Sequence, residues 1–416
     1  MIKSNYPIIT VTGTKGKTSV ARMLDFALGK NFEQVLRVDT DGAYINGSLI
    51  FSDDESRDRW GYTPTNCPGR FLALISDKSN ISILESTVFS SKTGLGYKAH
   101  DIGIFTNVFE DHLGGTKMLK TVEDIAKHKS FVLKSIKKGG TAIYNGDDDL
   151  VVSQLSVIKP GVNRIAVTKK RTQNSDGAVC YISEKNLEII VSGKTVLKLV
   201  LNDFHWLQIN HGPSLYNFAF VVSALFSLLS KEKFNSSINL LSDYTYDPAG
   251  GRMVQLKIAD GPRVILDFAH EKQSLIEIAK YARSLVGNDN SVVGVVRLAP
   301  SRTAELIDDT AKSIVPSFDK FIVYDMVDGF LRKAGVVKGF ANKKEEVGYI
   351  SKLFYGFLHK YGAKSVKRII REDEAIAAAI SDAKQNDVVI YIVSGDSRRS
   401  FEFLKAAADG KKVIIL

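Results

Sequence analysis

Short apolar runs alternate along the chain with stretches in which apolar residues recur every three or four positions. Runs of the first kind are typical of buried strands, and the recurring pattern is typical of amphipathic helices. Alternation of continuous apolar strands with helices predicts a doubly wound, mostly parallel α/β fold. The clearest helical pattern is Val20, Ala21, Leu24, Ala27 and Leu28, and the predicted strands are residues 8–11, 81–84, 102–105, 141–144, 264–266, 292–296, 321–324, 388–393 and 413–416.

One region departs from this rhythm. Residues 164–201 alternate between apolar and polar positions, with turn-forming sequences at 174–177 (NSDG) and 192–194 (SGK). Such alternation between turns predicts hairpins, and therefore a small antiparallel appendage on the first domain.

A cluster of proline and glycine at residues 247–251 (DPAGG) predicts a domain boundary, because a helical stretch ends there and a new series of strands begins. We therefore expect a P-loop-containing central domain over residues 1–248 and a smaller, Rossmann-like α/β domain over residues 249–416. Both lengths are compatible with single domains.

Composition and charge exclude several classes of protein for this chain. Of the 416 residues, 44% are hydrophobic and 25% are charged, which excludes a disordered or fibrous chain. No apolar run is long enough to span a membrane, and no signal peptide precedes residue 8, so a cytoplasmic location is expected. The net charge of +10 favours anionic ligands, whereas no zinc-finger or RNA-recognition pattern supports nucleic-acid binding. The two cysteines lack metal-site spacing.

The strongest local signal is a glycine-containing loop between the first predicted strand and the first predicted helix. Backbone N–H groups of such a loop cradle phosphates, Lys17 would reach the β- and γ-phosphates, and the Thr18 hydroxyl would bind Mg²⁺. The usual P-loop pattern has glycine at its first position, where this chain has Val11. The loop residues predicted to bind the nucleotide are Gly13, Thr14, Lys15, Gly16, Lys17, Thr18 and Ser19.

Residues 12–18 (TGTKGKT) closely resemble the TGTxGKT loop of the Mur ligase superfamily, and further motifs of that superfamily follow in the same order. These are Glu85-Ser86 and residues 105–113 (FTNVFEDHL), 123–130 (EDIAKHKS), 145–148 (NGDD), 212–217 (GPSLYN), 251–253 (GRM) and 267–270 (DFAH). Within the superfamily the motifs are most similar to the Mur-ligase-like half of cyanophycin synthetases. Other stand-alone relatives, such as the pseudomurein peptide ligases, remain open.

The resemblance implies an ATP-dependent carboxylate–amine ligase that acts through an acyl phosphate. It implies two Mg²⁺ ions, with Thr18 and Glu85 as ligands of one and His112 as a ligand of the other. In the same way it implies that Asn217 contacts adenine, that Asp267 accepts the ribose hydroxyls and that Arg252 neutralises phosphate charge. Arg302 and Arg332 fall roughly where relatives hold a substrate, although the Pro300-Ser301 sequence departs from the family pattern.

The resemblance also places a lysine that is carbamylated by CO₂ near residue 129. A carbamate would supply two oxygens and a negative charge to a metal, whereas an ammonium would repel it. Lys127 is a rival two residues away. Lys129 is favoured because apolar residues follow the family's lysine, as Phe131 and Val132 do here.

The expected substrate class depends on which domains precede the glycine-containing loop. The loop begins at residue 12, so neither an ATP-grasp half nor a nucleotide-sugar-binding domain is expected to precede it. We therefore expect an amino acid and an acidic or peptide-like carboxylate as substrates, with the acceptor near residues 39–69 and 92–97. The alternatives are a catalytically idle regulatory or scaffold protein that binds ATP, and a generic P-loop NTPase acting on nucleic acid.

Overall fold

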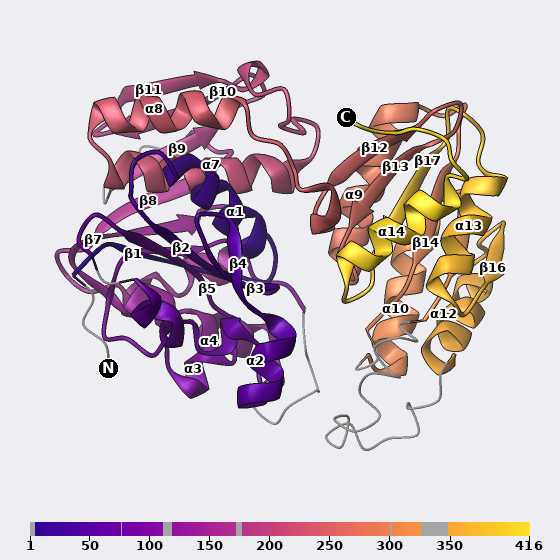
Figure 1. Cartoon of the computed structure of the whole chain (residues 1–416), viewed down its shortest axis with the longest axis horizontal. Coiled ribbons are helices and arrows are strands. Elements are labelled where there is room, and N and C mark those ends of the chain that lie inside the picture. Colours follow the sequence, from indigo (N-terminus) through magenta and orange to yellow (C-terminus); the bar gives the residue numbers. More distant parts are fainter. Residues whose placement is uncertain (1–4, 76, 111–118, 172–176, 300–301, 326–347) are drawn as a thin grey trace. The chain divides into compact units, whose positions relative to one another are not determined.

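A computed structural model describes residues 5–75, 77–110, 119–171, 177–299, 302–325 and 348–416. The chain divides into two compact units, Met1–Tyr244 and Thr245–Leu416 (Figure 1). The boundary expected from the sequence, after residue 248, falls in the short 3₁₀-helix η5 (Pro248–Gly250) near the start of the second unit.

The first unit is built on one sheet of eleven strands in the order β11-β10-β9-β8-β7-β6-β1-β5-β2-β3-β4. The central strand β1 is buried at every position and pairs in parallel with β5 and β6, as the apolar pattern predicts. The strands are β1 (Ile8–Thr12), β2 (Val35–Asp39), β3 (Gly42–Ile45), β4 (Ser48–Ser52), β5 (Ile81–Glu85), β6 (His100–Phe105), β7 (Ile136–Asn145), β8 (Asn163–Thr168), β9 (Ala178–Ile182), β10 (Asn186–Val191) and β11 (Lys194–Val200).

Antiparallel strands extend this sheet at both ends. The predicted turn at Ser192-Gly193 joins β10 to β11, and both turn residues have positive φ, as a two-residue hairpin requires. Residues 174–176 of the other predicted turn lie outside the described residues. The hairpin expected there is wrong, because β8 and β9 run parallel. Alternating polarity indicates a half-exposed strand but does not give the direction of its neighbour.

Helices cover the sheet of the first unit. Helix α1 packs against α7 and α8, and in Figure 1 these helices lie on the side of the central strands opposite α2, α3 and α4. The helices are α1 (Lys17–Leu28), α2 (Asp53–Trp60), α3 (Ser90–Thr93), α4 (Val122–Lys129), α5 (Phe131–Lys134), α6 (Asp149–Val152), α7 (Gly212–Leu228) and α8 (Lys231–Ser242).

The second unit has a seven-stranded sheet in the order β16-β15-β14-β17-β13-β12-β18. The five strands from β16 to β13 are parallel, whereas β12 is antiparallel to both of its neighbours. The elements are β12 (Val254–Ile258), β13 (Arg263–Asp267), α9 (Lys272–Val286), β14 (Val292–Val296), α10 (Ala304–Ile314), β15 (Lys320–Val323), α12 (Tyr349–Lys360), β16 (Val366–Arg368), α13 (Glu372–Asp382), β17 (Val388–Ile392), α14 (Ser397–Ala407) and β18 (Val413–Ile415).

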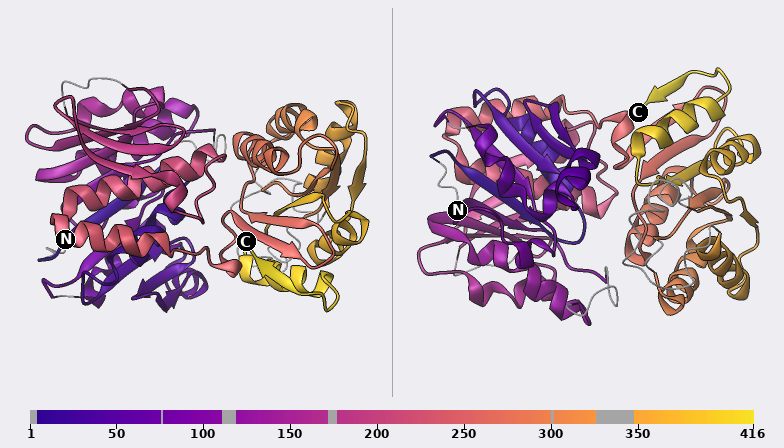
Figure 2. Two further views of the ribbon diagram at one scale, coloured as in Figure 1. Left: turned by 90° about the horizontal axis from the view of Figure 1, so that it is seen from above. Right: turned by 60° about the horizontal axis from the view of Figure 1, so that its bottom comes forward.

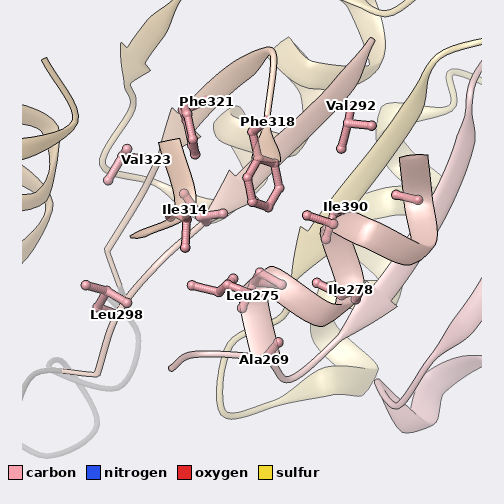
Figure 3. Close-up of a cluster of buried hydrophobic side chains, with 14 of the residues drawn as sticks. Ala269, Leu275, Ile278, Val292, Leu298, Ile314, Phe318, Phe321, Val323 and Ile390 are labelled. Carbon is pink, nitrogen blue, oxygen red and sulfur yellow. The ribbon is translucent and has the colours of Figure 1, made fainter. Parts of the chain in front are cut away.

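Alternate strand residues of this sheet enter two different cores. Ile390 joins Leu275 and Ile278 of α9 in one core (Figure 3), whereas Tyr391 joins Ala375 of α13 in the other. The left view of Figure 2 shows helices on both sides of the sheet. A strand buried on both faces must be apolar at every position, which explains the continuous apolar runs and confirms the doubly wound α/β fold. No helix among the described residues is long and apolar enough to cross a bilayer.

A buried histidine makes the first unit sensitive to acid. His100 is fully buried, its Nε2 lies 2.8 Å from the carbonyl oxygen of Val132, and burial lowers its pKa to about 3. Below pH 6.5 the unfolded chain binds a proton that the folded chain excludes, so stability falls as the pH drops toward 3. Between pH 7 and pH 5 this single group should remove about 2 kcal/mol of unfolding free energy.

Urea unfolding followed by tryptophan fluorescence measures this effect, because both tryptophans, Trp60 and Trp206, belong to the first unit. Burial also lowers the pKa of His211, to about 4, so the wild-type protein loses stability at both sites. His100→Gln should remove only its own share of the pH dependence. A slope for His100→Gln equal to that of the wild type would contradict the assignment.

Candidate functional site

The glycine-containing loop joins β1 to α1 and is shaped by two glycines with positive φ. Gly13 has φ 146° and Gly16 has φ 84°. A Cβ on Gly13 would lie 1.9 Å from Thr106 Oγ1, and one on Gly16 would lie 2.2 Å from Asn217 Oδ1. No side chain caps the N-terminus of α1, which begins at Lys17. The loop therefore brings backbone N–H groups and a helix N-terminus to one place, as phosphate binding requires.

The segment after β6 holds this loop in shape. The backbone N–H of Lys15 donates to Asn107 Oδ1 at 2.8 Å, and Thr106 Oγ1 donates to the Lys15 carbonyl at 2.6 Å. The N–H of Thr14 donates to the Asn107 carbonyl at 2.9 Å, and the N–H of Phe109 donates to Thr14 Oγ1 at 3.1 Å. The sequence motif contains Thr106 and Asn107, but sequence reasoning assigned them no role.

Glu85 lies at the end of β5 beside the first turn of α1. Its carboxylate is 2% exposed and accepts hydrogen bonds from Thr18 Oγ1 at 2.8 Å and from Thr40 Oγ1 at 3.1 Å. Lys17 Nζ lies 3.7 Å from Glu85 Oε1 and donates to the Thr14 carbonyl at 3.0 Å. One carboxylate, two hydroxyls and one ammonium thus meet at the loop. Thr40 was not predicted, because the strand before it, β2, contains Arg37 and Asp39 and does not form a continuous apolar run.

Lys129, at the end of α4, also reaches the loop. Its side chain is buried, and Nζ donates to the Gly13 carbonyl at 2.7 Å. The rival Lys127 is exposed on the same helix. His112 lies outside the described residues.

Near the start of α7, Tyr216 and Asn217 face different partners. Asn217 lies against Gly16, as the close approach to that glycine shows. The Tyr216 hydroxyl donates to Asp147 Oδ2 at 2.6 Å. Burial alone would raise the pKa of Asp147, but hydrogen bonds from Tyr216, Lys169 N and Thr168 hold it below its usual value. Asp147 is therefore a charged anchor for the start of α7.

In the second unit, Asp267 ends β13 and accepts a hydrogen bond from the Met253 N–H at 2.8 Å. The Arg252 guanidinium lies 4.4 Å from the centre of the Phe268 ring, and the Arg297 guanidinium lies 4.8 Å from the same ring. Arg297 is 1% exposed, and its Nε and one Nη donate to the Val393 carbonyl. Burial lowers the pKa of Arg297.

Of the two arginines expected to bind substrate, Arg302 and Arg332, the structure describes Arg302 alone. Arg302 is buried just before α10, and its backbone N–H donates to the Ala299 carbonyl at 3.1 Å. Arg332 lies outside the described residues. Sequence reasoning missed Arg297, since an arginine directly after an apolar strand is not distinguished from a solvated one by pattern alone.

Two family models match the chain. The Mur ligase middle domain matches residues 11–200, and the Mur ligase glutamate ligase domain matches residues 251–395. The chain belongs to the Mur ligase superfamily, which confirms the resemblance seen in its motifs.

Individual relatives are distant. Cyanophycin synthetase of Nostoc sp. is 24% identical over 413 residues, which cover 94% of this chain and 42% of that protein. The chain thus spans less than half the length of that relative. Among solved structures, E. coli FolC in complex with DHPP and ADP has a TM-score of 0.65 and 15% identity, covering 97% of this chain and 89% of FolC. A pseudomurein peptide ligase type C from Methanothermus fervidus has a TM-score of 0.64 and 17% identity, covering 97% and 79%. These likenesses show a shared fold.

Proposed function

We propose that the chain is an ATP-dependent ligase that joins an amino acid to a peptide-like carboxylate and releases ADP and phosphate. The observation that carries the proposal is the meeting of Lys17, Thr18, Glu85 and Lys129 at one glycine loop. Family membership and the ADP bound in the structurally similar FolC support the choice of nucleotide.

The residues at the loop fit Mg²⁺, which prefers hard oxygen ligands and few protein carboxylates. Thr18 and Glu85 offer such oxygens 2.8 Å apart. Among the described residues no group of three or more His, Cys, Asp or Glu side chains could hold a metal ion. When bound, Mg²⁺ would neutralise phosphate charge. Lys129, as a carbamate, and His112 are proposed for a second Mg²⁺.

Other residues are assigned to the rest of the nucleotide. Lys17 would stabilise the charge that develops on the γ-phosphate. Within residues 13–19, backbone N–H groups other than those of Thr14 and Lys15, which donate to Asn107, would bind the phosphates. Asn217 would contact adenine, Asp267 the ribose hydroxyls and Arg252 a phosphate. Arg302 and Arg332 are proposed to bind substrate.

The reaction needs little covalent chemistry from the protein. A carboxylate oxygen of the acceptor attacks the γ-phosphorus, and the bond to the leaving ADP oxygen breaks, which gives an acyl phosphate. The amino nitrogen of the second substrate then attacks the acyl carbon, loses a proton and expels inorganic phosphate. The side chains at the loop position the reactants and stabilise charge.

Hydroxylamine trapping tests the proposal. The protein is incubated with ATP, Mg²⁺ and candidate acidic peptides, and hydroxamate is measured together with ADP. The amino acids are then screened for ADP release with each active peptide. Hydroxamate that depends on both ATP and the peptide supports the ligase. Tight ATP binding with neither ADP nor hydroxamate would instead support the regulatory or scaffold alternative.

A further inference from the structure

A group of aromatic and basic side chains lies on the first unit beside the segment that follows Glu85. Its members are Arg59, Trp60, Tyr62 and Arg70, which we call the arginine–aromatic surface. The Arg59 guanidinium lies 5.6 Å from the centre of the Trp60 ring. The Arg70 guanidinium lies 5.2 Å from the Trp60 ring and 5.5 Å from the Tyr62 ring.

The rings of this surface form a fixed platform. Trp60 stacks on Phe51 with ring centres 5.0 Å apart, meets Phe71 edge-on at 5.6 Å and lies parallel to Tyr62 at 6.3 Å. Phe71 is buried, whereas Trp60 and Tyr62 are half-buried. A guanidinium held over such a ring is oriented before any ligand arrives.

Both arginines of the surface are exposed, and no described carboxylate lies within ion-pair distance of either. Two of the four acidic residues of α2 have other partners close by. Asp53 pairs with Arg57 at 2.7 Å, and Glu55 accepts a hydrogen bond from the N–H of Ser52 at the helix start. Two oriented guanidinium groups that lack an internal acid are suited to carboxylates, which accept paired N–H donors from arginine.

Hydrogen bonds tie the surface to the segment that begins at the candidate site. Thr87 Oγ1 donates to Asn66 Oδ1 at 2.8 Å, and Ser90 Oγ donates to the Thr65 carbonyl at 2.8 Å. The Gly69 N–H donates to the Leu95 carbonyl at 2.9 Å.

A close approach of backbones reinforces this link. A Cβ on Gly69 would lie 2.2 Å from the Leu95 carbonyl oxygen, so no larger residue fits there without movement. Arg70 follows directly in sequence, and its position is therefore fixed relative to the chain that leads back to Glu85.

We infer that the arginine–aromatic surface binds carboxylate groups of the acidic acceptor, an inference that rests on the proposed function. The surface falls at the acceptor region expected from the sequence, near residues 39–69 and 92–97. Guanidinium groups at a distance from the reacting carboxylate would hold other acidic groups of the same chain. Their loss should raise the KM for the acceptor and leave kcat unchanged.

The direct test measures binding without turnover. Wild-type protein is titrated with a synthetic hexaglutamate peptide at 50 mM and 300 mM salt, and the fluorescence of Trp60 is followed. Trp60→Phe identifies the part of the signal that comes from this ring. We expect Arg59→Ala and Arg70→Ala each to raise the Kd about tenfold at low salt, and the wild-type affinity to fall at high salt.

Arg57→Ala is the matched control, since it removes the same charge from the same helix at a residue already paired with Asp53. Equal affinity for the peptide in all variants, or no binding to the wild type, would overturn the inference. Displacement of the peptide by a single-stranded oligonucleotide at lower concentration would also overturn it, since stacked bases would then be the better occupant. The hydroxylamine assay keeps the two proposals apart. If Arg59→Ala and Arg70→Ala form hydroxamate at the wild-type rate with an unchanged KM for the acceptor, the ligase proposal holds and the inference about the arginine–aromatic surface is wrong.

Discussion

Lys17→Ala should leave the first unit folded and reduce ADP formation by about 10²–10³-fold, the loss typical of removing one donor that stabilises developing charge. Its ammonium lies at the loop, 3.7 Å from Glu85 Oε1, and its side chain is 14% exposed. Removing the ammonium also leaves the buried Glu85 carboxylate without this counter-charge, so the temperature of unfolding should fall although the unit stays folded. ADP formation with the cognate substrates and ADP binding by titration calorimetry are the measurements.

Lys30→Ala is the matched control for Lys17, because it removes the same charge from an exposed position just beyond the end of α1. This variant should bind ADP and turn over ATP like the wild type. Wild-type phosphate release by Lys17→Ala would show that the loop does not bind the transferred phosphate.

Lys129→Ala should lose activity by about the same factor, and short-chain carboxylic acids should restore part of it. The wild-type side chain is buried and donates to the Gly13 carbonyl at 2.7 Å. A carbamate nitrogen keeps one hydrogen, so this hydrogen bond survives modification while the charge changes sign. A small carboxylate that enters the vacated space would bring back the negative oxygens that the metal needs.

Lys127→Ala, at the exposed position of the same helix, should remain active. Because Lys129→Ala also empties buried space, a second experiment leaves the protein unmutated. Wild-type activity should fall in CO₂-free buffer and return with bicarbonate, and ¹³C-labelled bicarbonate should give a carbamate NMR signal that is absent from Lys129→Ala. Full activity of Lys129→Ala without additive would make Lys129 a structural residue.

The sequence predicts the fold well where burial is complete. Strands such as β14 and β17 form continuous apolar runs because both faces are covered, whereas an exposed strand or an amphipathic helix would show polar residues at regular intervals. The strands β2, β3 and β4 at the other end of the sheet were not predicted, and neither was the change at β2 from parallel pairing with β5 to antiparallel pairing with β3. Residues of β3 and β4 are partly exposed, and strand direction depends on neighbours that are distant in sequence.

Part of the candidate site was likewise predicted from the sequence and part of it was missed. The loop and Glu85 follow from local motifs, since each lies at the junction of a strand and the next segment. Thr40 and Arg297 matter through contacts with residues far away in sequence, so no local pattern marks them. The surface formed by Trp60 and Arg70 likewise exists only after η1 (Pro64–Asn66) and η2 (Pro68–Leu74) have turned the chain back.

The parallel pairing of β1 has a consequence for how the chain folds. The hairpins β3–β4 and β10–β11 join neighbouring segments and close quickly, whereas β1 pairs only with β5 and β6. Thr18 and Glu85 are 67 residues apart, and Lys129 and Gly13 are 116 residues apart. A nascent chain that carries the complete loop therefore still lacks Lys129 until much of the first unit has been synthesised. Under the proposed function, nucleotide affinity would therefore be acquired late in folding, and ATP would stabilise only chains whose long-range pairing is already complete.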